Sequence, residues 1–146
     1  MHLHWALILV FGANAPAHSG RADSCFHYAP TVVALTGRLI QRTLPGPPHY
    51  DSFRRGDRPE PVDFLVLDAP LCTIADYKDS PNTDSFTHQD TVQVRKRELT
   101  WRDVRRLTGQ RVTITGTLAE WALGADRTPV LLDPTAIRLA ASGSKP

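Results

Sequence analysis

The stretch that decides the fold runs from Thr108 to Trp121 and reads TGQRVTITGTLAEW. Its apolar residues Val112, Ile114 and Leu118 alternate with threonines, which is the pattern of a strand with one buried face. Gly116 occupies an inward position in this pattern, where a side chain is expected. A glycine at such a position predicts a sharp bend or a bulge in a coiled strand.

An earlier segment repeats the same pattern. Residues 33–39 read VALTGRL and residues 112–118 read VTITGTL, so both fit V-x-[LI]-T-G-x-L. Two long, glycine-bent strands in a chain of 146 residues predict a small, highly coiled barrel that these two strands close.

The remaining patterns place further elements around these two strands. In chain order they predict a strand at 31–42, a strand at 62–74, a strand at 91–97, a helix at 98–109, the strand within 108–121 and a strand at 128–139. This order is that of the OB-fold, a five-stranded Greek-key barrel with a helix between its third and fourth strands. We therefore expect an all-β dominated, OB-like barrel. A β-sandwich is the alternative, although sandwiches usually contain more strands.

The predicted helix carries start and stop signals. Thr100 is placed to cap it, and Asp103 answers the cap at the third helical position. Leu99 and Val104 have the spacing of a hydrophobic staple, and Gly109 ends the helix.

The alternation of apolar residues also predicts the core. The tryptophan at the start of the helix is expected to cover one end of the barrel. The residues expected to point inward are Val33, Leu35, Leu39, Leu65, Val92, Val112, Ile114, Leu118 and Val130, with Trp101 over the end.

Two polar segments separate the early strands. The segment 43–61 holds five of the twelve prolines, so we expect an ordered surface loop that is neither helix nor central strand. Loops of this length are usually functional or disordered. The segment 76–90 is rich in turn residues and predicts a mobile loop or a hairpin tip.

The first 17 residues contain no Lys, Arg, Asp or Glu and end in small residues. This pattern indicates a signal peptide with cleavage between 17 and 24. A buried N-terminal strand or helix is the alternative, and the apolar run is too short to span a membrane. We expect a single domain at 25–140 and a disordered tail at 141–146.

Cys25 and Cys72 are the only cysteines of the chain. An even pair in an exported protein predicts a disulfide, which could stabilise the fold by roughly 4 kcal/mol as an upper bound. Two buried free thiols are the alternative if the protein is not exported.

Composition and motifs restrict the possible chemistry. The net charge of +2 is far from the strongly basic balance of a nucleic-acid-binding protein. Arg95, Lys96 and Arg97 lie in a strand without aromatic residues for stacking bases, which argues against nucleic acid. No two histidines have the spacing of metal ligands, and no cofactor motif is present, so we expect neither a metal nor a cofactor.

Several short motifs resemble a bacterial family. They are Cys25 with Tyr28, VALTGRL, PGPPHY at 45–50, GDRPE at 56–60, APLC at 69–72, VTITGTL and TPVLL at 128–132. Together they resemble the family called domain of unknown function 4431 over most of residues 25–132. The resemblance implies a small exported bacterial protein with no assigned activity. The family pattern has histidines before TPV, whereas this chain has Gly124 to Arg127 there, which argues against a histidine-based site at that place.

Two function classes follow from these observations. The first is a non-catalytic, monomeric periplasmic or secreted module that binds a protein, a cell-wall component or a small molecule. Its candidate ligand-binding residues are Tyr50, Phe53, Asp57 and Glu60, because prolines and glycines pre-order the loop around them and aromatic residues anchor ligands well.

The second class is a hydrolase-like enzyme that uses Asp57, Glu60 or His49 for acid/base chemistry. The flanking arginines favour structural ion pairs for the two carboxylates instead, so we do not expect an enzyme. A further alternative is that the loop only plugs the mouth of the barrel, with its two aromatic residues as satellite core.

Overall fold

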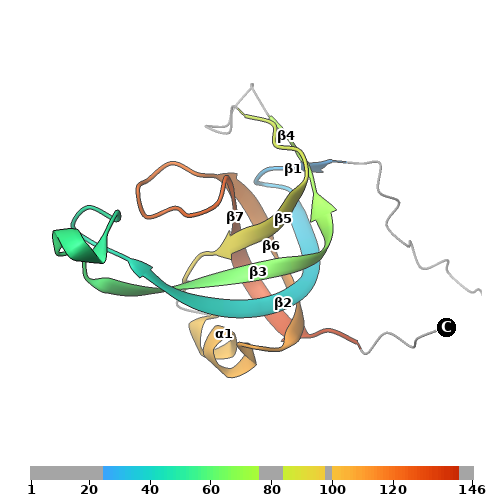
Figure 1. Ribbon diagram of the computed structural model, residues 1–146. Coiled ribbons are helices and arrows are strands. Elements are labelled where there is room, and N and C mark those ends of the chain that lie inside the picture. The colour runs from blue at the N-terminus through green and yellow to red at the C-terminus, as the bar shows by residue number, and fades with distance from the viewer. Residues whose placement is uncertain (1–24, 76–83, 98–99, 142–146) are drawn as a thin grey trace, which may run out of the picture.

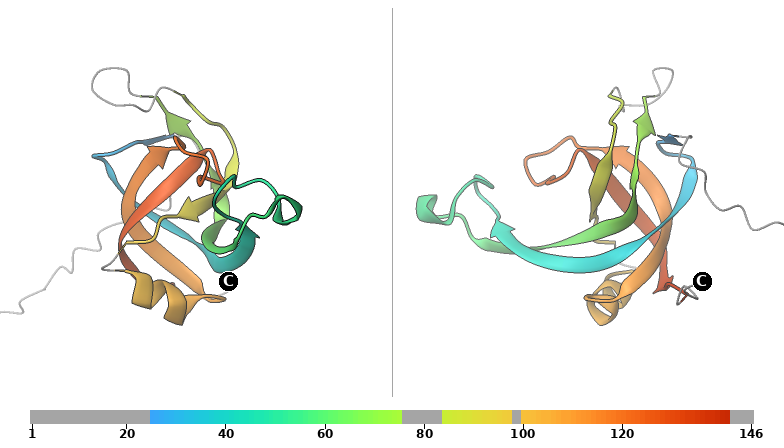
Figure 2. Two further views of the ribbon diagram at one scale, coloured as in Figure 1. Left: turned by 90° about the vertical axis from the view of Figure 1, so that its left-hand side faces the viewer. Right: turned by 45° about the vertical axis from the view of Figure 1, so that its right-hand side comes forward.

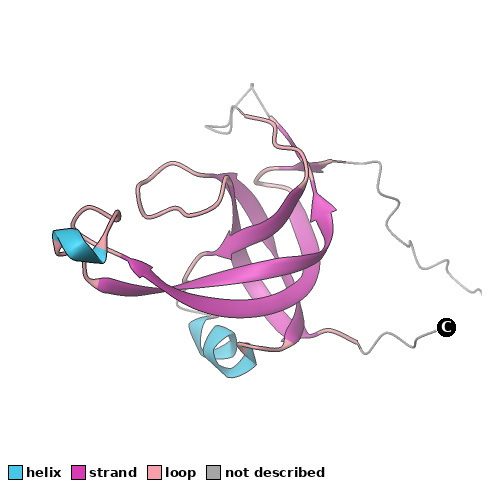
Figure 3. Cartoon of the chain, in the orientation of Figure 1, coloured by secondary structure: helices cyan, strands magenta, loops and turns pink. Residues whose placement is uncertain are grey.

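A computed structural model of the chain describes residues 25–75, 84–97 and 100–141. Figure 3 shows that strands dominate this part, and Figure 1 shows its one α-helix at one end of them. The main strands are β2 (Val32–Pro45), β3 (Pro59–Leu71), β5 (Gln89–Val94), β6 (Arg111–Glu120) and β7 (Val130–Leu139), and the helix is α1 (Trp101–Leu107).

The five main strands hydrogen-bond in a closed ring in the order β2–β3–β5–β7–β6. All neighbours are antiparallel except β5 and β7, which run parallel over a short pairing. In chain order, helix α1 follows β5, the third main strand, and precedes β6, the fourth. This connectivity confirms the predicted OB-like barrel. The sandwich alternative is wrong, because these strands form one ring and not two facing sheets.

Gly116 and Gly37 lie where neighbouring backbones approach most closely. The pairing of β6 with β7 shifts register between Thr115 and Gly116, which confirms the predicted irregularity at this glycine. A Cβ atom at Gly116 would lie 2.1 Å from the carbonyl oxygen of Asp133, and one at Gly37 would lie 2.1 Å from that of Val66. The absence of a side chain therefore permits both close approaches.

The inward positions of the barrel are buried as predicted. Leu39, Leu65, Ile114 and Leu118 have no exposed surface, and α1 adds Val104 to the same apolar cluster. The complete predicted set is buried: Val33, Leu35, Leu39, Leu65, Val92, Val112, Ile114, Leu118 and Val130.

The start of α1 differs from the prediction. Thr100 precedes the helix, but its side chain makes no capping hydrogen bond. Asp103 does not answer a cap; its carboxylate lies 3.0 Å from the guanidinium group of Arg106. Leu99 of the predicted staple lies outside the described residues. Gly109 follows the helix with φ of 89°, a conformation that favours glycine.

Trp101 does not cover the end of the barrel. Its side chain is exposed, and the guanidinium carbons of Arg102 and Arg105 each lie 5.5 Å from the centre of its ring. The indole therefore pairs with cations at the surface, while Val104 and Leu107 pack into the core. The prediction for Trp101 was wrong because it assigned the residue to the buried face of the helix from spacing alone.

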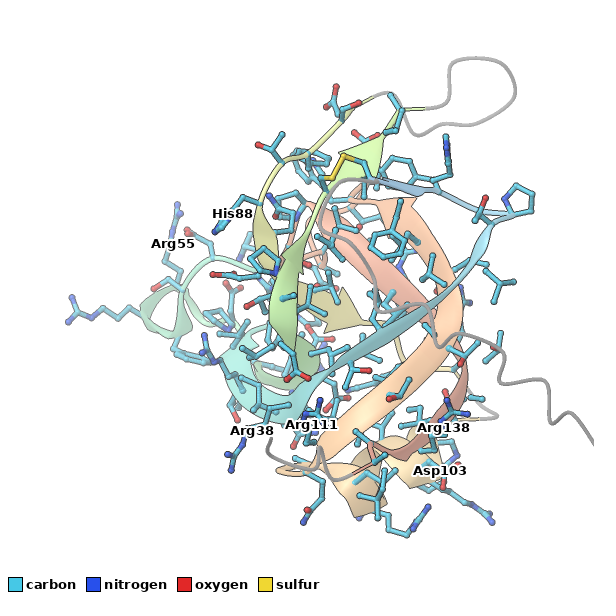
Figure 4. The ribbon with its side chains drawn as sticks, turned by 90° about the vertical axis from the view of Figure 1, so that its right-hand side faces the viewer. Arg38, Arg55, His88, Asp103, Arg111 and Arg138 are labelled. Atoms are coloured by element: carbon cyan, nitrogen blue, oxygen red, sulfur yellow. A yellow bond between two sulfur atoms is a disulfide. The ribbon has the colours of Figure 1, made fainter. Side chains whose placement is uncertain are left out.

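The N-terminal end of the described chain is attached to the barrel. A short strand β1 (Phe26–His27) pairs in parallel with β4 (Thr73–Ile74). Cys25 and Cys72 form a disulfide with their Cα atoms 4.6 Å apart, which confirms the predicted bridge (Figure 4). The buried hydroxyl group of Tyr28 lies 2.9 Å from a threonine hydroxyl of β4, so a hydrogen bond joins the same two segments.

Three predictions fall wholly or mostly outside the described residues. They concern the leader at 1–17, most of the loop at 76–90 and the tail after residue 141. Within the described ranges, none of the helices has the length and apolar character needed to cross a membrane.

Candidate binding face

β2 and β3 continue beyond the barrel as a two-stranded arm, visible at the left of Figure 1 and in the right-hand view of Figure 2. The arm ends in residues 46–58, called the hairpin loop below, which include the 3-10 helix η1 (Phe53–Arg55). Pairing reaches Pro45 opposite Pro59. The outer parts of 43–61 are therefore strands, and the prediction that this whole segment is a loop was wrong.

The register of the arm explains why its prolines are tolerated. The N–H of Gly46 donates a hydrogen bond of 2.7 Å to the carbonyl oxygen of Arg58. Hydrogen-bonded and non-bonded pairs alternate along an antiparallel ladder, so the adjacent pair, Pro45 with Pro59, is a non-bonded one. Pro61 lies two residues further along the same strand, again at a non-bonded pair. None of these prolines needs the N–H that it lacks.

Asp57 organises the hairpin loop. Its side chain has no exposed surface, and its two oxygens accept hydrogen bonds from the backbone N–H groups of His49, Asp51 and Ser52 at 2.9, 2.7 and 2.8 Å. The ring nitrogen Nδ1 of His49 lies 3.1 Å from the same carboxylate. Burial by itself raises the pKa of Asp57, but these hydrogen bonds together hold the pKa well below its ordinary value of 3.8.

This arrangement replaces the expected ion pairs with arginines. Among the described residues, no arginine forms an ion pair with Asp57, and Arg55 instead forms an ion pair of 2.5 Å with Asp51. Backbone N–H groups outcompete the arginines because the loop closes tightly around the carboxylate, whereas arginine side chains extend into solvent.

Replacing Asp57 with asparagine is expected to loosen the hairpin loop. One carboxylate oxygen becomes an amide NH₂ group, which cannot accept the hydrogen bonds of the backbone. Trypsin cleavage after Arg54 and Arg55 at neutral pH should become faster, on the order of tenfold, because the loss of a charge-assisted hydrogen bond populates the open loop. Asp51→Asn is the control, since its carboxylate is exposed and holds only a surface ion pair.

The same carboxylate gives the loop a defined pH dependence. Because the folded pKa of Asp57 is lowered, its contribution is fully present at neutral pH and is lost as the pH falls below the ordinary value of 3.8. Amide hydrogen exchange at His49, Asp51 and Ser52 should therefore lose protection below that pH in the wild type. Equal trypsin cleavage rates for Asp57→Asn and Asp51→Asn would contradict the role of Asp57 in closing the hairpin loop.

A second loop, residues 121–129, joins β6 to β7 and is called the β6–β7 loop. A buried carboxylate organises it in a similar way. Asp126 accepts hydrogen bonds from the backbone N–H groups of Ala122 and Leu123 at 2.8 and 3.0 Å. Arg95 lies 3.7 Å from the same carboxylate, so the loop is also linked to the end of β5.

Arg127 connects the two loops. Its guanidinium group donates hydrogen bonds to the carbonyl oxygens of Tyr50, at 3.0 Å, and Pro45, and it lies 5.4 Å from the ring centre of Tyr50. The backbone N–H of Arg127 donates to the side-chain oxygen of Gln93 at 2.6 Å. These contacts fix the hairpin loop and the β6–β7 loop relative to each other, and the left-hand view of Figure 2 shows the two side by side.

A cleft of about 230 Å³ lies along β3 and β5 next to these loops. Glu60, Gln93 and Ala125 belong to its lining, together with the arginines and lysine at the end of β5. The Oε2 atom of Glu60 is buried and has no hydrogen-bond partner in the described part of the chain. A buried oxygen without a partner is unusual in a folded protein, because burial removes its hydrogen bonds to water.

A shallower hollow of about 210 Å³ lies at the β6–β7 loop. Trp121, Asp126, Arg127, Thr128 and Pro129 line it. The side chain of Trp121 is 54% exposed, and Leu123 of the same loop is 67% exposed. The β6–β7 loop therefore presents apolar side chains to solvent beside polar groups.

The four predicted site residues take different places. Tyr50 packs against Arg127, Asp57 is buried within its own loop, and Glu60 lines the cleft. Phe53 is 51% exposed in η1. Sequence reasoning missed Arg127 and Trp121. The aromatic character of Trp121 was visible in the sequence, but its position on a second loop beside the first was not.

The contact between His49 and Asp57 is the nearest approach to catalytic geometry. The side chain of His49 is 63% exposed. The hydroxyl oxygen of Ser52 accepts a hydrogen bond of 3.2 Å from the backbone N–H of Arg54. Neither His49 nor Asp57 lines the cleft or the hollow described above. The described residues also contain no group of three or more His, Cys, Asp or Glu side chains that could hold a metal ion.

Comparison with known proteins gives no family or relative for this chain. No family model, curated protein or solved structure matches it. The resemblance to domain of unknown function 4431 stays a prediction.

Proposed function

We propose that this protein is a non-catalytic binding module of an exported bacterial protein, with its ligand held at the hairpin loop and the β6–β7 loop. The observation that carries the proposal is the set of contacts made by Arg127, which joins two separate loops into one pre-ordered surface. Pre-ordering lowers the entropy lost when a ligand binds.

The side chains on this surface support recognition by contact. Phe53 and Trp121 are large aromatic residues that remain half exposed on loops held by buried carboxylates. Exposed aromatic residues on ordered backbone are common anchors in binding sites. Glu60 lines the adjacent cleft and adds a carboxylate to this surface. A ligand with an apolar face and hydrogen-bond donors, such as a cell-wall glycan or a peptide, fits these groups.

Export is the second part of the proposal. The disulfide between Cys25 and Cys72 is a bond that persists in oxidising compartments. The uncharged leader at 1–17 and the resemblance to a family of small exported proteins support the same compartment. Periplasmic material whose mass corresponds to a chain beginning at Met1 would contradict removal of the leader.

A hydrolase-like enzyme is the second candidate, favoured by the hydrogen bond between His49 and Asp57. A carboxylate that orients a histidine is the arrangement used by general bases. The exposure of His49 argues against it, and so does the hydroxyl group of Ser52, which accepts a hydrogen bond from the backbone N–H of Arg54.

The binding proposal is tested with alanine variants of exposed apolar residues, two on the loops and one outside them. The mature protein is immobilised and incubated with a periplasmic extract and, separately, with soluble peptidoglycan fragments. Phe53→Ala and Trp121→Ala are expected to weaken binding of the retained ligand at least tenfold without changing the melting temperature, since both side chains are half exposed. Leu139→Ala is the control, because Leu139 is 58% exposed on β7 outside both loops.

Two results would contradict the proposal. The first is equal retention of ligand by the two loop variants and the control. The second is hydrolysis of the peptidoglycan fragments that is lost in His49→Ala, which would establish the enzyme instead.

A further inference from the structure

A further cavity adjoins the cleft of the candidate binding face. It has a volume of about 560 Å³ and lies between α1 and the arm formed by β2 and β3. Its lining residues are Gln41, Pro61, Asp63, Lys96, Trp101, Val104, Arg105 and Thr108. The volume falls in the range of cavities that hold small organic ligands.

The floor of this cavity is polar and fixed. Asp63 is buried, at 3% exposure, and one of its carboxylate oxygens accepts a hydrogen bond of 2.8 Å from the side-chain amide of Gln41. The two residues face each other across the pairing of β2 with β3. A buried carboxylate held in this way can accept a further hydrogen bond from a ligand hydroxyl group.

The wall formed by α1 is apolar and cationic. Trp101 and Val104 supply apolar surface, and Arg105 lies over the indole ring of Trp101 at 5.5 Å. Neither Arg105 nor Lys96 has an ion-pair partner within the described ranges; the ammonium group of Lys96 donates instead to the carbonyl oxygen of Pro61 at 2.7 Å. Two cations beside an indole suit an aromatic group that carries an anion.

We propose that this cavity binds a small aromatic carboxylate that bears a hydroxyl group. The carboxylate lies between Lys96 and Arg105, the ring packs on Trp101 and Val104, and the hydroxyl group donates to Asp63. Because the lining combines two cations with one buried acceptor, it selects the charge of the ligand.

This site is chemically distinct from the loop surface, although the cavity and the cleft share Pro61, Asp63 and Lys96 on their boundary. The loop surface offers exposed aromatic residues on ordered loops. The cavity offers a pair of cations and a buried acceptor beneath a helix. The proposal therefore does not depend on the function proposed for the loops.

The test uses two probes of nearly the same size and opposite charge. 4-Hydroxyphenylacetate has a carboxylate and a phenol, and tyramine has a protonated aminomethyl group in place of the carboxylate. Calorimetry with the mature protein should show saturable binding of the first and at least tenfold weaker binding of the second. In nuclear magnetic resonance, the indole N–H of Trp101 should shift on titration while that of Trp121 does not.

Two arginines provide a matched pair of variants. Arg102 and Arg105 lie at the same distance from the ring of Trp101, but only Arg105 lines the cavity. Arg105→Gln should weaken 4-hydroxyphenylacetate binding about tenfold, whereas Arg102→Gln should change it less than about twofold. Phe53→Ala, which tests the loop surface, should leave this binding unchanged.

Three outcomes would overturn the proposal. The first is no saturable binding of 4-hydroxyphenylacetate at millimolar concentration. The second is equal affinity for tyramine, because Lys96 and Arg105 would then not distinguish an anionic ligand from a cationic one. The third is an equal loss in Arg102→Gln and Arg105→Gln, which would assign the effect to general surface charge.

Discussion

Replacing Ile114 with alanine is expected to lower the free energy of unfolding by about 2–5 kcal/mol, as is usual when a large buried aliphatic side chain is truncated. Ile114 has no exposed surface and lies in the middle of β6, opposite Leu35 of β2 and Ile137 of β7. All three side chains belong to the core cluster. A cavity at this point removes contacts from three strands of the ring at once. Urea denaturation, with the slope held common to both proteins, measures the loss.

Thr117→Ala is the control for this prediction. Thr117 lies on the same strand with the opposite orientation, and its side chain is only partly buried. Its truncation should cost less than about 1 kcal/mol. A loss of that small size for Ile114→Ala would contradict the register, because a shift by one residue would turn Ile114 outward.

Strand periodicity was the part of the fold that the sequence predicted best. Val112, Ile114 and Leu118 alternate with threonines because one face of β6 meets the core and the other does not. This relation between period and burial is local, so it can be read without knowledge of the partner strands. Gly116 was predictable for a related reason: a missing side chain at an inward position indicates a close backbone approach.

The start of α1 was harder to predict because its local signals were misleading. Thr100 and Asp103 have the spacing of a capping box, but neither makes the capping hydrogen bonds. Trp101 has the spacing of a core residue and is exposed between two arginines. In a helix of only 7 residues, the packing of Val104 and Leu107 fixes the orientation, and capping adds little.

The prolines of the arm were a misleading signal of a different kind. Pro45 and Pro59 suggested a loop, yet they stand opposite each other in a ladder at a pair that needs no hydrogen bond. The composition of a segment does not reveal which of its residues face a partner strand. Only the register of β2 against β3 does so.

The candidate site depends mostly on long-range contacts that sequence reasoning could not find. Asp57 was singled out as one of two loop carboxylates flanked by arginines, but its partners proved to be backbone N–H groups. Arg127 binds carbonyl oxygens that lie 77 and 82 residues earlier in the chain. Main-chain carbonyl groups leave no pattern in a sequence, so neither the link between the loops nor its importance could be predicted.

Removing the disulfide is expected to cost about 2–4 kcal/mol of unfolding free energy. The bridge between Cys25 and Cys72 closes a loop with a sequence separation of 47, for which the chain-entropy model gives about 4 kcal/mol as an upper value. The bridge also lies beside the short pairing of β1 with β4, which has only two residues in each strand and little strength by itself. Without the bridge, the segment before β2 can separate from the barrel.

The variant that replaces both cysteines with alanine measures this cost by urea denaturation against the oxidised wild type. Reduced wild type is the matched control, because it loses the bond but keeps both side chains, and its stability should agree with that of the variant. Amide exchange should show the largest loss of protection at Phe26 and Thr73, whose N–H groups donate to the carbonyl oxygens of Cys72 and Phe86. Two free thiols per unfolded, non-reduced wild-type chain would contradict the bridge, and a cost below about 1 kcal/mol would contradict its role in holding the N-terminal segment to the barrel.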